Sequence, residues 1–208
     1  MNRIYLELGA KKVFACSLDW PGWCRAGKSE EPALDRLLDY APRYRVVAER
    51  AGLDFDPGAP TVVERLDGRS ATDFGIPEVH AKADHEPLTE AEAGRQVAIM
   101  RAAWELFDER AAASPEELRK GPRGGGRDRT KMVEHVEEAE RGYARILGVK
   151  HPPYRSRQDR DALREELAAV LSRPWTGPWE PKWTPRYALR RITWHVLDHL
   201  WEMEDRRT

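Results

Sequence analysis

The chain has 208 residues, of which 40% are hydrophobic and 34% charged, enough apolar side chains for one sizeable domain or two small ones with a highly charged surface. It holds 35 Lys and Arg against 36 Asp and Glu, so the formal net charge is -1 and no basic excess is present to neutralise nucleic-acid phosphates. The N-terminus has no long apolar run, so we expect neither a signal peptide nor a membrane span, and a cytoplasmic location by default.

The sequence pattern of the first part of the chain is typical of a small α/β domain, which we predict over residues 1–80. Apolar and polar residues alternate on both sides of a short turn at Gly9–Lys12, which is typical of a β-hairpin. A helix is expected where leucines recur every three or four residues. The predicted elements are strands over 4–8, 13–18, 23–25 and 61–66, a helix that begins near Ser29, restarts after Pro42 and ends near Gly52, and an irregular stretch over 74–79.

A polar linker over residues 81–88 leads to a second domain, predicted over 89–208. Two of its helices open with a capping box, in which a Ser or Thr precedes an acidic residue by three positions. Four segments carry apolar side chains at helical spacing, which predicts a C-terminal four-helix bundle and an α+β fold overall. The predicted starts are Thr89 with Glu92, a helix over 131–147, Ser156 with Asp159, and Thr184 followed by Pro185.

Two connections in this half are expected to be irregular. The basic, Gly-rich stretch 119–129 follows no apolar strand and lacks a Gly-Lys-Ser/Thr ending, so we interpret it as a loop and not as a phosphate-binding loop. The stretch 175–183 is rich in Pro and Trp. The two cysteines, Cys16 and Cys24, lack a CxxC spacing and lie among apolar neighbours, which favours buried free thiols over a disulfide.

The final helix carries a histidine pair at i and i+4, His195 and His199, within an apolar stripe. Imidazoles one turn apart on one helix face can hold one divalent metal ion, because their ring nitrogens converge. His135 lies in a similar stripe on the helix predicted over 131–147. Three inward histidines would form an open metal site with positions left for water or substrate. The alternative is that all three are core histidines without a metal.

With these residues in view, the stretch 89–206 resembles the DinB-like superfamily of metal-binding four-helix-bundle proteins. The resemblance rests on Glu134-His135-Val136 and on the segment from His195 to His199. It implies that His135, His195 and His199 are the ligands of a divalent metal ion, most often zinc or nickel. It also implies kinship with metal-dependent transferases and isomerases that use low-molecular-weight thiols such as mycothiol or bacillithiol, and bundles of this type commonly form homodimers.

The N-terminal segment Phe14–Leu34 is similar to the strand, Asp-x-Pro-Gly turn and helix of HicB-like small α/β domains, with the bend at Pro21-Gly22. This resemblance implies a fold alone, since no toxin-binding or DNA-binding segment can be traced.

Two functions follow as expectations. The first is a metal-dependent thiol S-transferase or isomerase that acts on small electrophiles, with Glu138 and Glu202 as candidates for proton transfer and the catalytic residues otherwise open. The second is a non-enzymatic module that binds a metal or a small ligand and senses it. In both cases we expect a small-molecule partner, no nucleic acid and no membrane, with a homodimer as an open alternative.

Overall fold

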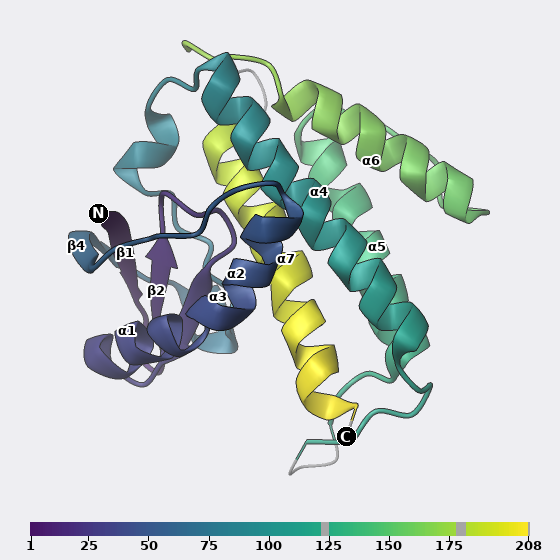
Figure 1. The fold of residues 1–208 in the computed structure, drawn as a ribbon, viewed down its shortest axis with the longest axis horizontal. Helices are drawn as coiled ribbons and strands as arrows, with labels where there is room; N and C mark the ends of the chain where they lie inside the picture. Colours follow the sequence, from purple (N-terminus) through teal and green to yellow (C-terminus); the bar gives the residue numbers. More distant parts are fainter. Residues whose placement is uncertain (122–124, 178–181, 208) are drawn as a thin grey trace.

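A computed structural model of the chain describes residues 1–121, 125–177 and 182–207, and it has an α+β architecture (Figure 1). The strands lie in the first third of the chain, and the long helices follow. One continuous apolar cluster joins strand residues such as Ile4 and Leu6 to residues of the long helices such as Met100 and Leu197. The sheet is therefore packed into the same core as the helices that carry the histidines.

The sheet is mixed, with the strand order β3-β2-β1-β4. β1 (Asn2–Leu8) pairs antiparallel with β2 (Val13–Ser17), and β2 pairs antiparallel with β3 (Cys24–Gly27). This confirms the predicted hairpin, whose turn is closed by a hydrogen bond from Gly9 N to Lys12 O at 2.9 Å. The chain then passes through α1 (Glu30–Asp39) and α2 (Ala41–Arg50) and returns as β4 (Pro60–Asp67), which pairs in parallel with β1.

One face of the sheet rests on the last helix, α7 (Pro185–Arg206). The Phe14 ring of β2 meets the Trp194 ring of α7 edge-on, with centroids 6.3 Å apart. Gly22, in the turn between β2 and β3, has a φ of +85°, and a Cβ there would lie 2.7 Å from Cγ2 of Thr193. Glycine is needed at this turn because the conformation is left-handed and the backbone approaches α7 closely.

Four long helices make up the rest of the described chain: α4 (Glu90–Ala113), α5 (Arg129–Ile146), α6 (Arg157–Leu171) and α7. α7 and α6 each pack against both α4 and α5 (Figure 1). The predicted N-caps are confirmed, since Thr89 Oγ1 accepts from Glu92 N at 3.2 Å and Ser156 Oγ accepts from Asp159 N at 3.2 Å. Among the described residues, no helix combines the length and the apolar character needed to cross a bilayer.

Several features differ from the sequence prediction. A short helix, α3 (Ser70–Phe74), and a 3-10 turn, η1 (Lys82–His85), were not expected. η1 lies within the predicted linker, where the Asp84 side chain is buried and Leu88 N donates to Trp175 O at 2.7 Å. Parts of the two connections predicted to be irregular, residues 122–124 and 178–181, lie outside the described residues.

The prediction of two free thiols is wrong. Cys16 on β2 lies directly opposite Cys24 on β3, with Cα atoms 4.1 Å apart, and the two form a disulfide. The prediction relied on spacing along the chain, whereas strand register decides which cysteines face each other.

Candidate metal centre

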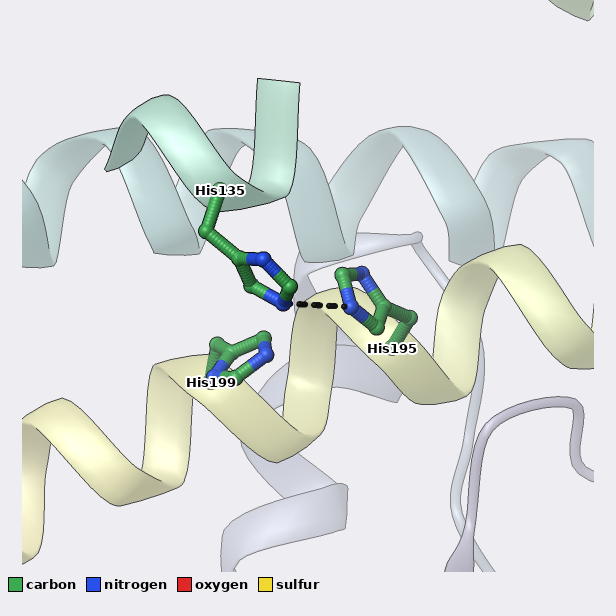
Figure 2. Close-up of side chains that lie close together, drawn as sticks. All are labelled: His135, His195 and His199. Atoms are coloured by element: carbon green, nitrogen blue, oxygen red, sulfur yellow. Dashed lines mark hydrogen bonds between the residues drawn. The ribbon is translucent and has the colours of Figure 1, made fainter. Parts of the chain in front are cut away.

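The two helices α5 and α7 pack against each other and bring the three predicted histidines together (Figure 2). His195 and His199 lie one turn apart on α7 and are buried, with 7% and 8% of their surface exposed. His135 extends from α5 and is half-buried. It lies beside the buried face of that helix, which includes Met132 and Val136. The three imidazoles thus meet between a mostly buried stretch of α7 and a face of α5 that still borders solvent.

The ring nitrogens lie at separations that suit a metal ion. Nε2 of His135 and Nε2 of His195 are 3.3 Å apart, and one nitrogen from each of the three histidines lies within 4.8 Å of the other two. Zinc–nitrogen distances of about 2.0–2.1 Å in a tetrahedral site separate two ligating nitrogens by about 3.3–3.4 Å. The His135–His195 pair already has that separation.

The surroundings keep two of the imidazoles neutral, which is the form that binds a metal. Burial is the main cause: together with the nearby charge of His199 it lowers the pKa of His135 to about 4, and it lowers the pKa of His195 well below the ordinary value of 6.5. Both rings are therefore unprotonated at neutral pH, and protons compete only weakly for their lone pairs.

Glu202 orients one of the three rings. His199 Nδ1 donates to Glu202 Oε2 at 2.9 Å, and Arg206 Nη1 donates to the other carboxylate oxygen at 2.6 Å. Burial alone would raise the pKa of Glu202, but the hydrogen bonds from His199 and Arg206 bring it below its ordinary value. With its proton on Nδ1, His199 turns the lone pair of Nε2 toward the other histidines, as in the carboxylate–histidine–metal arrangement.

The other acidic residues near the histidines have different partners. Glu138, named with Glu202 as a candidate for proton transfer, is exposed on α5. Asp198 accepts from Arg25 Nη1 at 2.7 Å, and Glu204 accepts from Arg110 Nη2 at 2.9 Å. Asp198 and Glu204 thus serve as ion-pair partners between elements. Of the four acidic residues Glu138, Asp198, Glu202 and Glu204, only Glu202 has a hydrogen bond to a histidine of the cluster within the described residues.

The geometry also bears on the alternative in which the histidines are ordinary core residues. A buried histidine in a core normally has both ring nitrogens hydrogen-bonded. Within the described residues, His195 Nδ1 has no partner, and its Nε2 faces only another imidazole. Two neutral rings can share at most one hydrogen at that contact, so this cluster is poorly satisfied by hydrogen bonds alone.

From the sequence, Glu202 is one of several acidic residues on the last helix that could orient a histidine or carry a surface charge, and the structure shows that Glu202, at i, i+3 from His199, makes that contact. The sequence did not indicate the role of Tyr143, whose ring meets His195 edge-on at a centroid distance of 5.6 Å.

Comparison of the chain with protein-family models, with curated proteins and with solved structures finds no match. Function is therefore inferred from the geometry of the site alone.

Proposed function

We propose that this protein binds a divalent metal ion, zinc or nickel, through His135, His195 and His199. The observation that carries the proposal is the convergence of three imidazoles from α5 and α7, two of them held neutral. Neutral imidazoles suit zinc, nickel, copper and iron, so the metal present also depends on which ion the cell supplies. The four helices α4–α7 would then form a DinB-like four-helix bundle, with a HicB-like N-terminal domain beside it.

The activity we propose is a metal-dependent S-transfer or isomerisation that uses a low-molecular-weight thiol on a small electrophile. When bound, the metal ion would lower the pKa of a thiol or water beside it, so that the anion exists near neutral pH. Three protein ligands leave room for such a group, whereas a fourth would close the site. In the transfer, a sulfur–carbon bond forms as the bond from carbon to its leaving group breaks, and the thiol proton passes to solvent.

The chain's own residues would prepare this site in two ways. Glu202 fixes the ring of His199 through the 2.9 Å hydrogen bond, so little motion is needed when the ion binds. The burial of His195 excludes water from one side of the site, which strengthens electrostatic interactions there.

Metal content tests the first part of the proposal. Protein purified without chelator should contain about one zinc or nickel per chain by elemental analysis. His195→Ala should lose that metal while far-ultraviolet circular dichroism shows the helices intact. His85→Ala, which removes an exposed histidine elsewhere, is the matched control and should keep the metal. Metal retained in full by His195→Ala would refute the site.

Turnover tests the second part. The metal-loaded protein should form thioether conjugates from mycothiol or bacillithiol and a panel of electrophiles, and mass spectrometry would detect them. If the metal is present but no thiol and electrophile pair reacts, the alternative of a non-enzymatic metal-binding or sensing module takes precedence. That module should lose much of its thermal stability when the metal is chelated.

A cytoplasmic location and a homodimer belong to the same proposal. The disulfide between Cys16 and Cys24 argues against that location, because structural disulfides are uncommon in the cytoplasm. Alkylation of the protein directly from cells, followed by mass spectrometry, would show whether the two cysteines are free thiols, as a cytoplasmic location requires, or disulfide-bonded. Light scattering of the purified protein would give the oligomeric state.

A further inference from the structure

A cavity of about 460 Å³ lies between the N-terminal segment and the helices that carry the histidines. This volume is in the range of small-molecule sites. The N-terminal side of its lining comes from residues near α3, and the other side comes from the end of α5 and the first turns of α7. Its lining residues include Arg69, His80, Lys182, Trp183, Tyr187 and Arg191.

The central feature of the cavity is the buried cation of Arg191. Arg191 is only 7% exposed. Within the described residues, its Nη1 has no hydrogen-bond partner. Its guanidinium lies over the Trp194 ring at 4.5 Å and over the Tyr143 ring at 5.5 Å. The preceding Arg190 is different, because it is paired with Asp84 at 2.5 Å. The aromatic faces offset part of the cost of burying this guanidinium but give its Nη1 no hydrogen-bond acceptor.

The charges around the cavity favour an anion. Arg69, Lys182 and Arg191 contribute three permanent cations, against the single carboxylate of Glu78. Burial lowers the pKa of His80, so that ring is uncharged at neutral pH and adds a flat face. His80 stacks on Tyr187 with centroids 3.7 Å apart. A ligand here meets positive charge and aromatic surface together.

The cavity is aligned with the candidate metal centre along α7. Arg191 precedes His195 by four residues, one helical turn and about 6 Å along the axis. The Tyr143 ring contacts both the Arg191 guanidinium and the His195 ring.

We propose that this cavity is a binding site for a small organic carboxylate with a flat, conjugated or aromatic body, and that Arg191 is the residue that recognises the carboxylate. The proposal rests on the proposed function in one respect, namely that this carboxylate belongs to one of the two reactants, the electrophile or the thiol.

Binding of benzoate to the full chain, freed of metal with a chelator, tests the cavity independently of the metal centre. Isothermal titration calorimetry should show that benzoate binds and that the uncharged analogue benzamide binds at least about tenfold more weakly, because the charge-assisted hydrogen bonds are lost. Since no metal is present, failure of the proposed function would not change this result.

Variants of Arg191 separate recognition from a structural role. Arg191→Met should weaken benzoate binding at least about tenfold while its melting temperature stays equal or rises, because a buried cation whose Nη1 lacks an acceptor among the described residues is replaced by an apolar chain of similar length. Arg191→Lys should retain part of the affinity, and Arg173→Met, at an exposed arginine, should change nothing. Unchanged benzoate affinity in Arg191→Met, or a large fall in its melting temperature, would overturn the proposal.

Kinetics of the metal-loaded protein then distinguish the two sources of the carboxylate. Benzoate inhibition that is competitive with the electrophile assigns the cavity to the electrophile, and competition with the thiol assigns it to the thiol. If benzoate occupies the cavity without competing with either reactant, no reactant binds there, and this part of the inference fails.

Discussion

Replacing Glu202 with glutamine should weaken metal binding and leave the fold of α7 in place. Glu202 holds His199 Nδ1 at 2.9 Å, and its carboxylate makes the imidazole both better oriented and more basic. Losing such a partner typically lowers metal affinity by about 10- to 100-fold, which corresponds to about 1.4–2.7 kcal/mol. The glutamine side chain can still accept a hydrogen bond but has no charge. The affinities should therefore fall in the order wild type, Glu202→Gln, Glu202→Ala.

The assay is a competition for zinc between the protein and a chromophoric chelator at fixed pH and ionic strength. Glu204→Gln is the matched control, because Glu204 lies two residues away on α7 and pairs with Arg110 instead of a histidine. Its zinc affinity should equal that of the wild type. Loss of the ion pair with Arg206 should cost Glu202→Gln less than about 1 kcal/mol of stability, since that pair is partly solvated.

Two results would contradict the reasoning. A zinc affinity of Glu202→Gln within twofold of the wild type would mean that the carboxylate does not orient a ligand. Equal losses in Glu202→Gln and Glu204→Gln would mean that general negative charge on α7 matters, and not the contact with His199.

Two further predictions concern the framework. Glu140→Gln should lower the free energy of unfolding by about 3 kcal/mol in urea titrations, because it leaves the buried guanidinium of Arg164 with one carboxylate fewer. The control Glu165→Gln, on the surface, should lower it by under about 1 kcal/mol. Equal losses in the two variants would refute this. Glu92→Gln should lower the free energy of unfolding by about 1 kcal/mol near neutral pH. The reason is that hydrogen bonds from the Thr89 cap and from Arg186 lower the pKa of Glu92 to about 2, and solvent screening of this exposed side chain keeps the effect small. The folded pKa is lowered, so this stabilisation is complete above pH 4.5 and is lost as the pH falls toward 2; a difference from the wild type that persists at pH 2 would contradict the assignment.

Local signals in the sequence predicted most elements of the fold. The capping boxes at Thr89 and Ser156 placed two helix starts at the correct residue, because the cap is made by side chains three positions apart. α3 gave no such signal, since its five residues are held by a distant contact: Thr72 Oγ1 donates to the buried carboxylate of Glu7 at 2.6 Å. The pairing of β1 with β4 likewise depends on a crossover that no local pattern encodes.

The candidate site divides in the same way. The i, i+4 spacing of His195 and His199 on one helix follows from the sequence, because one helix turn fixes it. That His135 on α5 joins them is a matter of how two helices pack, and the sequence supplied only the apolar stripe that turns it inward. The role proposed for Arg191 lay beyond sequence reasoning, because it follows from the burial of its Nη1 without a hydrogen-bond partner among the described residues.

The register of α7 connects the cavity to the metal centre. Each step of four residues on a helix advances about 40° around its axis. Arg191, His195 and His199 therefore lie on one gently rotating stripe, which begins beside the N-terminal segment and reaches His199, whose ring contacts Glu202. A shift of α7 by one residue would turn the whole stripe by about 100° and remove both sites at once. Gly22, which packs directly against α7, and the edge contact of Phe14 with Trp194 oppose such a shift. The sheet thus has a functional reason to share a core with the helices: it fixes the rotation of the one helix on which both proposed sites depend.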